Sequence, residues 1–117
     1  MINWIPLVSV EQLPDIVERS TEVPCFVFKH SISCPISALS KHRLEHYWDL
    51  AESRAEFYFL DLIRHRDVSN LVAGTFQVRH ESPQVLLIRN GQCVYHASHL
   101  DITAGTLQAQ LNVPADL

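Results

Sequence analysis

Short apolar runs separated by turn-forming residues mark the predicted strands of this chain. Residues 25–30, Cys-Phe-Val-Phe-Lys-His, show no apolar–polar alternation, which is typical of a central parallel strand covered on both faces. Residues 56–62 are rich in aromatic side chains and predict a second strand. Residues 84–89 and 92–97 flank Asn90-Gly91, a strong hairpin signal, because a type I′ turn needs positive φ at both central positions.

Helical spacing of apolar residues predicts the elements between these strands. Residues 1–8 fit either a short edge strand or a tail packed on the domain. Ser9 and Gln12 have the spacing of a capping box, which begins the first helix. Three further helices are expected: 35–53, with Ile36, Leu44, Tyr47 and Ala51 on its apolar side; a short one after Asp67; and one from about Asp101 or Thr103 to Leu111.

The order of these elements predicts the fold class. Two strands joined through a helix run parallel, and the hairpin supplies antiparallel neighbours. We therefore predict an α/β protein with a mixed central sheet flanked by helices. A length of 117 residues, of which 47% are hydrophobic, suits one domain with one core, over residues 1–117.

Composition excludes several classes of function. No stretch approaches the roughly 18 apolar residues of a membrane span, so we expect no membrane partner. The formal net charge is −4 and no basic run is present, which argues against nucleic acid as a partner. Residues 1–4 lack the charged and apolar regions of an export signal, so we expect a cytoplasmic protein.

Cys34 is the residue on which we expect the function to depend. It follows a predicted buried strand, and Pro35 suits the first position of a helix, where a missing N–H is no loss. The N-cap position exposes Cys34 to unpaired backbone N–H groups and to the positive end of the helix dipole, which favour a thiolate. Lys29 and His30 lie close in sequence and are candidates for further stabilising that thiolate.

The other cysteines and the histidines carry weaker signals. Cys25 lies at the far end of the predicted strand, too distant from Cys34 for a disulfide, and Cys93 follows the hairpin turn. We expect both to be structural. Neither a Cys-x-x-Cys pair nor a spaced Cys/His quartet is present, so no metal site is predicted.

Three ordered motifs carry a resemblance to a known family. A strand, a turn, Cys-x-x-Ser and a helix together resemble the active site of the thioredoxin superfamily, with Ser37 in place of a resolving cysteine. More narrowly, Phe-Lys-His-Ser at 28–31 followed by Cys-Pro-Ile-Ser at 34–37 resembles the YtxJ-like family, the monothiol bacilliredoxins of the bacillithiol system. His-Glu-Ser-Pro-Gln at 80–84 and Ser-His at 98–99 extend the resemblance to about residues 3–112.

The resemblance implies a thioredoxin-like fold and a substrate groove. It implies a cis Ser82-Pro83 bond facing Cys34, where the backbone of Ser82 can bind an extended thiol substrate. His80 and Glu81 are expected to line the same groove, beside Pro35 and Ser37. Ser98 and His99, expected at the start of the last helix, would bind the anionic end of the low-molecular-weight thiol.

The function implied is that of a monothiol thiol–disulfide oxidoreductase. Cys34 would take bacillithiol from protein mixed disulfides, and because Ser37 cannot resolve the product, an external reductant would release it. Bacillithiol is then a cosubstrate, client proteins are partners, and no cofactor is tightly bound. Two alternatives stay open: a non-catalytic thioredoxin-fold binding module, and a glutaredoxin-like iron–sulfur carrier, although Pro35 and Ile36 depart from the small residues such a site needs.

Overall fold

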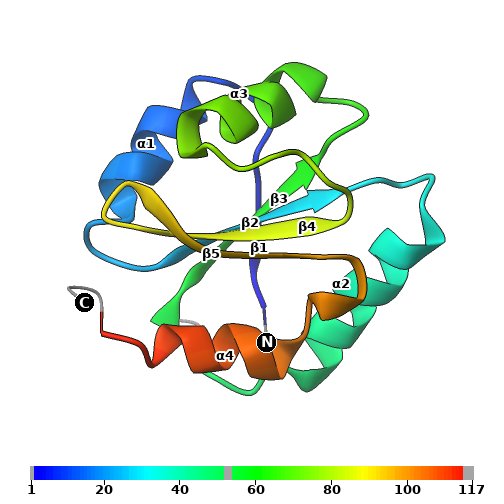
Figure 1. Ribbon diagram of the computed structural model, residues 1–117, viewed down its shortest axis with the longest axis vertical. Coiled ribbons are helices and arrows are strands. Elements are labelled where there is room, and N and C mark those ends of the chain that lie inside the picture. The colour runs from blue at the N-terminus through cyan, green and yellow to red at the C-terminus, as the bar shows by residue number, and fades with distance from the viewer. Residues whose placement is uncertain (1, 52–53, 115–117) are drawn as a thin grey trace.

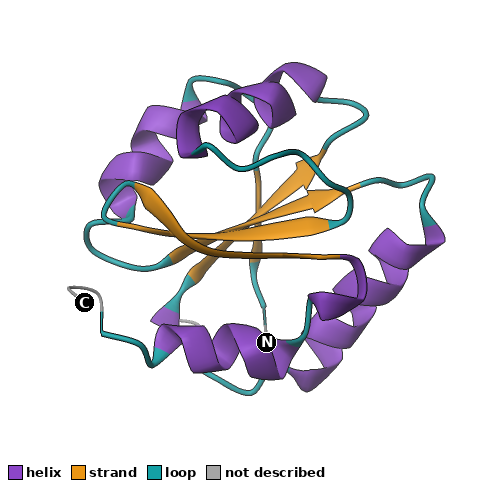
Figure 2. Ribbon diagram, in the orientation of Figure 1, coloured by secondary structure: helices purple, strands orange, loops and turns teal. Residues whose placement is uncertain are grey.

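The computed structural model describes residues 2–51 and 54–114. Within these ranges five strands form one sheet in the order β1-β3-β2-β4-β5, with helices on both faces (Figures 1 and 2). Helices α1 and α3 cover one face, and α2 and α4 cover the other (Figure 1). The elements are β1 (Trp4–Pro6), α1 (Gln12–Arg19), β2 (Cys25–His30), α2 (Pro35–Tyr47), β3 (Glu56–Asp61), α3 (Arg66–Phe76), β4 (Gln84–Arg89), β5 (Gln92–Ser98), the 3₁₀ helix η2 (His99–Asp101) and α4 (Ala104–Leu111).

Strand β2 is the centre of the sheet. It pairs in parallel with β3 and antiparallel with β4, and all of its residues are buried. The prediction of a mixed sheet with 25–30 as a central strand is therefore confirmed. The N-terminal residues form a short edge strand, β1, which runs parallel to β3.

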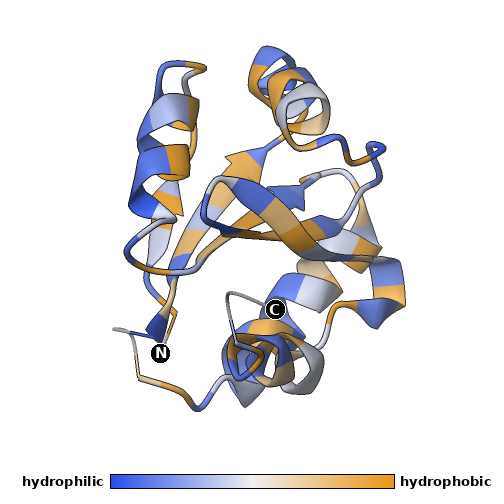
Figure 3. Ribbon diagram, turned by 60° about the vertical axis from the view of Figure 1, so that its left-hand side comes forward, coloured by the Kyte–Doolittle hydropathy of each residue, from blue (hydrophilic) through white to orange (hydrophobic). Residues whose placement is uncertain are grey.

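Alternation along β2 divides the core into two clusters. Phe26 and Phe28 contribute to the cluster beneath α2 and α4, whereas Cys25 and Val27 belong to the cluster beneath α1 and α3. Each fully buried phenylalanine contributes about 1.5–3 kcal/mol of transfer free energy. Figure 3 shows the strands as largely hydrophobic, between helices that carry both hydrophobic and hydrophilic residues. Lys29, one residue beyond Phe28, is a charged exception in this strand.

The turn at Asn90-Gly91 has the backbone conformation that the sequence predicts. Asn90 has φ of 52° and Gly91 has φ of 76°, as a type I′ turn requires. A Cβ atom on Gly91 would lie 3.2 Å from Cγ1 of Val17, so α1 packs closely against the turn. One bond of the predicted capping box is present, since the Ser9 amide donates to Oε1 of Gln12 at 3.0 Å, but α1 begins only at Gln12, with Glu11 as its N-cap.

Helix α2 departs from the prediction in length and in face. It ends at Tyr47, because the chain turns there to an extended conformation at Trp48, whose indole packs edge-on against Phe26 and Phe57. The last two residues of the predicted helix, 52–53, lie outside the described residues. Of the predicted apolar side only Leu44 is buried. Ile36, Leu39 and Tyr47 are exposed, while the buried face consists of Ser37, Ser40 and Leu44.

The helices in the described ranges are short. None of them is long and apolar enough to cross a membrane.

Candidate active site

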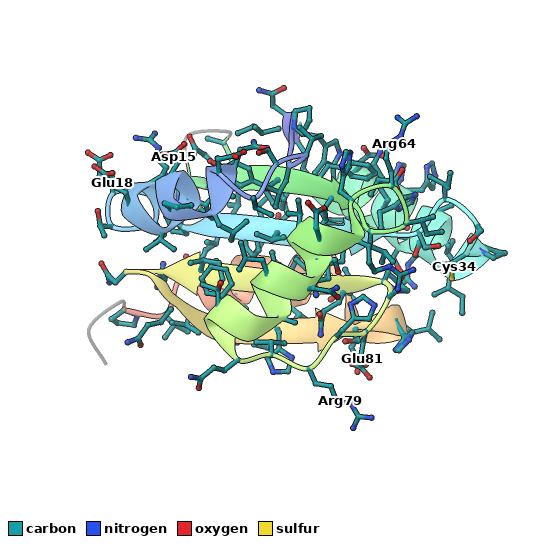
Figure 4. The ribbon with its side chains drawn as sticks, turned by 90° about the horizontal axis from the view of Figure 1, so that it is seen from above. Asp15, Glu18, Cys34, Arg64, Arg79 and Glu81 are labelled. Carbon is teal, nitrogen blue, oxygen red and sulfur yellow. The ribbon has the colours of Figure 1, made fainter. Side chains whose placement is uncertain are left out.

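Cys34 lies at the N-cap of α2, as the sequence predicts. Its backbone is extended, with φ of −110° and ψ of 113°, and Pro35 occupies the first helical turn. The chain reaches this position through a tight turn in which the Cys34 amide donates to the Ser31 carbonyl at 3.1 Å. The thiol is partly exposed at the end of the molecule opposite Asp15 and Glu18 of α1 (Figure 4). Cys34 can therefore meet a partner from solution.

Donors of the first helical turn stabilise the Cys34 thiolate. The backbone N–H of Ser37 lowers the pKa of the Cys34 thiol most, and the Ile36 N–H and the Ser37 hydroxyl lower it further. Partial desolvation opposes them, but the net pKa lies below the ordinary value. The first turn of α2 thus makes Cys34 a better nucleophile at neutral pH.

Ser37 is fully buried beneath the thiol. Its Oγ accepts a hydrogen bond from the Ser31 amide at 3.3 Å, which leaves its single proton to be donated toward the Cys34 sulfur. A hydroxyl cannot attack a disulfide, so residue 37 supports the thiolate but supplies no second thiol.

Lys29 lies elsewhere than the sequence suggested. Its ammonium group is fully buried and contacts the Ser69 carbonyl oxygen and Nδ1 of His80, each at 3.3 Å. Lys29 is not among the described groups that shift the pKa of Cys34. Strand alternation turns the side chain toward α3, on the face opposite α2.

His30 is also unsuited to supplying positive charge. Its ring packs against Phe59, with centroids 5.0 Å apart, and against Phe28 at 5.9 Å. Burial in this aromatic setting lowers the pKa of His30, and the nearby Lys41 charge lowers it further. A neutral imidazole adds no charge that could stabilise a thiolate, so the expected electrostatic role of His30 is not supported.

The Ser82-Pro83 bond is cis, as the family resemblance implied. The Pro83 carbonyl accepts a hydrogen bond from the His99 amide at 3.0 Å, and the His99 carbonyl accepts one from the Ser40 hydroxyl at 3.3 Å. These two bonds connect the loop before β4 to α2 through η2. The groove residues expected around Pro83 therefore belong to one hydrogen-bonded unit with the helix that carries Cys34.

Ser98 and His99 do not begin the last helix. Ser98 is the N-cap of the short helix η2 and His99 is its first residue, whereas α4 starts later, capped by the Thr103 hydroxyl, which accepts from the Thr106 amide at 3.2 Å. The helix-dipole argument for an anion at this position is thereby lost. In addition, Ser98 hydrogen-bonds the Glu81 carboxylate and so lowers the pKa of that carboxyl, with the charge of His99 as a smaller cause.

Cys25 and Cys93 have surroundings unlike those of Cys34. Burial, the largest cause, raises the pKa of Cys25 to about 12, and burial also raises the pKa of Cys93. Both pair in register with Ile88, at the end of β2 remote from Cys34. All three cysteines are free thiols.

Ser40 and Ser69, which the sequence analysis passed over, hold the site together with Gln84, which it named only as part of the motif at 80–84. Ser40 bonds the His99 carbonyl, and the buried Ser69 and Gln84 contact the loop that leads to Pro83. Ser40 could have been found from spacing, because Ser37, Ser40 and Leu44 recur at i, i+3 and i+7. An apolar-periodicity criterion overlooks a buried helix face made of serines.

Metal ligands are not gathered around Cys34. Over residues 2–51 and 54–114, no group of three or more His, Cys, Asp or Glu side chains is placed to hold a metal ion.

The sheet order, the helices on both faces and the single cysteine at the start of α2 define a thioredoxin-fold protein with a monothiol site. The chain matches the family described as monothiol bacilliredoxin BrxC over residues 5–107, and it belongs to that family. The predictions of a thioredoxin-like fold and of this family are confirmed.

Solved structures agree with this assignment. A structure described as a candidate oxidoreductase with a thioredoxin fold is 34% identical, with a TM-score of 0.79 and coverage of 94% of both chains. Thioredoxin from Trypanosoma brucei brucei has a TM-score of 0.70 at 17% identity, covering 93% of this chain and 88% of that one. Malassezia sympodialis thioredoxin also has a TM-score of 0.70, at 15% identity, covering 95% and 90%. The two thioredoxins are similar in fold alone.

Proposed function

We propose that the protein removes bacillithiol from protein mixed disulfides, with Cys34 as the only attacking thiol. The observation that carries the proposal is the position of Cys34, partly exposed at the N-cap of α2, where backbone and hydroxyl donors lower its pKa while Ser37 offers no second thiol. Membership in the monothiol bacilliredoxin family supports bacillithiol as the cosubstrate.

The proposed step is a thiol–disulfide exchange. The Cys34 thiolate attacks the bacillithiol sulfur of the mixed disulfide, the client–bacillithiol bond breaks, and the client cysteine leaves as a thiolate that takes a proton from water. Cys34 then carries the bacillithiol in a new disulfide. An external thiol then attacks the bacillithiol sulfur of this disulfide. The Cys34 thiolate is released, and the external thiol and bacillithiol form a new disulfide. No redox cofactor is needed, because the disulfides and thiols balance.

The groove residues are assigned roles within this proposal. The backbone of Ser82 binds the extended chain next to the disulfide, and Pro83, Pro35 and Ser37 shape the wall beside Cys34. Ser98 and the exposed His99 contact the polar end of the low-molecular-weight thiol. We place the reaction in the cytoplasm, where thiols are kept reduced, which agrees with three free cysteines.

The test follows bacillithiol from a client to Cys34. A small protein with one bacillithiol mixed disulfide is mixed with the reduced protein, and intact masses of both are recorded with time. Transfer to the wild type and none to Cys34→Ser is expected, with slower transfer from the same client carrying glutathione. Adducts on Cys25 or Cys93, or none, would overturn the proposal and favour a non-catalytic binding module. Equal rates for both thiols would remove bacillithiol as the preferred cosubstrate.

A further inference from the structure

A buried lysine lies in the central strand without a carboxylate partner. Lys29 has no exposed surface, and among the described residues no acidic side chain forms an ion pair with it. The alternation of side chains along β2 places Lys29 on the face that packs against α3, next to the apolar cluster that contains Val27. Burying an unpaired ammonium group is unfavourable, so its presence requires an explanation beyond packing.

The contacts of Lys29 are directed at one loop. Its Nζ lies 3.3 Å from Nδ1 of His80 and 3.3 Å from the Ser69 carbonyl oxygen. The Ser69 hydroxyl also lies 3.4 Å from the same nitrogen of His80. Because an ammonium group only donates, Nδ1 of His80 must be the unprotonated acceptor. Burial and the Lys29 charge both lower the pKa of His80, which favours that neutral form.

A second buried side chain holds the same loop. Gln84 pairs in register with Lys29 across β2 and β4, and the two side chains share one face of the sheet. Its Nε2 donates to the Arg79 carbonyl at 3.0 Å. Arg79 and Glu81 lie toward the same end of the molecule as Cys34 (Figure 4). The loop 79–83 is therefore fixed at its start by Lys29 and Gln84.

The end of this loop is the wall of the proposed groove. Pro83 is held to η2 by the His99 amide, and η2 is held to α2 by Ser40. A shift at His80 would pass through one residue, Glu81, to Ser82, whose backbone is proposed to bind substrate. Reacting groups are sensitive to such shifts, since a displacement of about 1 Å can cost about 100-fold in rate.

We propose that Lys29, acting through His80, is a positioning residue that sets the groove opposite Cys34 for disulfide exchange. This inference depends on one part of the proposed function, namely that Cys34 reacts with disulfides bound along this groove. A methionine would fill the space of the lysine stem without a buried charge. The fold therefore does not need this ammonium group, whereas the loop uses its hydrogen bonds.

The decisive variant is Lys29→Met, measured in three ways. We expect it to unfold at a higher urea concentration than the wild type, because the buried charge is gone. Its rate of exchange with oxidised bacillithiol is expected to fall about tenfold, because the loop is released. Alkylation of Cys34 by iodoacetamide, which needs no groove, is expected to keep its rate. A purely structural lysine would instead give a less stable protein.

His80 provides a matched pair of variants. His80→Asn keeps an acceptor near the position of Nδ1 and should retain most of the exchange rate, whereas His80→Leu should match Lys29→Met. If the pathway is shared, the double variant Lys29→Met/His80→Leu should be no slower than either single one. Val72→Ala, a buried change on α3 in the apolar cluster, removes none of the hydrogen bonds that hold the loop and should lower stability while keeping the exchange rate.

Two results would overturn the proposal. One is a Lys29→Met protein with a wild-type exchange rate, and the other is equal loss of exchange and alkylation, which would place the effect on the thiol itself. Oxidised glutathione is tested in parallel. If the wild type reacts with it as fast as with oxidised bacillithiol, the cosubstrate assignment fails, yet the ratio of variant to wild type still tests Lys29.

Discussion

The cysteines near the two ends of strand β2 have pKa values shifted in opposite directions. Cys25 begins the strand in the apolar cluster under α1 and α3, where burial raises the pKa of its thiol to about 12. Cys34 follows the other end at the start of α2, where the Ser37 and Ile36 amides lower the pKa of its thiol. The side chains are the same. Reactivity follows from whether unpaired N–H groups or apolar side chains surround the sulfur.

The two ends of β2 also differ in the polar side chains that are buried around them. The end near Cys34 buries Lys29, Ser37, Ser40 and Gln84, whereas the buried polar side chain near the Cys25 end is Ser20, beside the hairpin turn. Buried polar groups lower stability unless they are hydrogen-bonded. Their concentration at one end shows where the molecule departs from an optimal core, as functional sites commonly do.

The largest expected effect is selective alkylation of the native protein. At pH 7 a thiol with a pKa of about 12 holds on the order of a thousandfold less thiolate than an ordinary cysteine. Iodoacetamide should therefore modify Cys34 first and leave Cys25 unmodified, as read by peptide mass spectrometry. The Cys34→Ser variant should take up no label on the same timescale.

Unfolding provides the control for this selectivity. In concentrated urea all three cysteines should react at similar rates, because the environments that separate them are gone. Labelling of native Cys25 as fast as that of Cys34 would contradict the contrast between the two ends.

A smaller effect is expected on stability above neutral pH. Burial lowers the pKa of Lys29 from 10.5 to about 8. Below pH 8 both the folded and the unfolded chain hold the proton, and the folded state bears the full desolvation cost. Between pH 8 and 10.5 the unfolded state binds more protons, so the free energy of unfolding rises with pH, by about 3 kcal/mol from Lys29 alone.

Urea unfolding of the wild type and of Lys29→Met across this range measures the effect. The two proteins are compared because Cys25 and Tyr58 also affect stability in this pH range. Their pKa values are raised in the folded state, so their contribution to the free energy of unfolding falls as pH rises, in the wild type and the variant alike. His80 faces Lys29 from the loop, and Arg66 of α3 and Glu81 act on His80. A constant difference between the two proteins from pH 7 to 10.5 would show that Lys29 does not titrate as described.

Ser37→Ala should give the smallest change. The variant removes the hydroxyl that bonds the Ser31 amide and the Cys34 sulfur, so the pH profile of Cys34 alkylation should move to higher pH. Loss of one buried hydrogen bond should lower the free energy of unfolding by about 1 kcal/mol. Ser40→Ala, one turn further along the same buried face, serves as the control and should leave the alkylation profile unchanged.

A companion variant, Ser37→Cys, sharpens the monothiol assignment. A thiol one helical turn after Cys34 can attack a mixed disulfide on Cys34 and release its partner. The variant should form an internal disulfide, seen in the intact mass as the loss of two hydrogens, and should not accumulate the bacillithiol adduct. Persistence of that adduct would contradict the geometry assigned to residue 37.

Local signals predicted the parts of the fold whose causes lie in neighbouring residues. The apolar run of β2, Pro35 after Cys34 and Asn90-Gly91 each carry a backbone preference that the tertiary structure has no reason to override. The predicted face of α2 was wrong because Ser37 and Ser40 turn inward to bond the turn and η2, which leaves Ile36 and Leu39 exposed. No periodicity of apolar residues contains that information.

The sequence by itself determined the strand, the helix start and the reactive position of Cys34, because the N-cap and the first turn act within a few residues. Lys29 lies only a few residues before Cys34 in the sequence, yet the alternation of side chains along β2 directs it to the face of the sheet opposite α2. Only the tertiary structure decided that Lys29 meets His80, 51 residues away, and that Pro83, His99 and Ser40 form one unit. Such contacts depend on how strands pair and helices pack, which is a property of the whole chain.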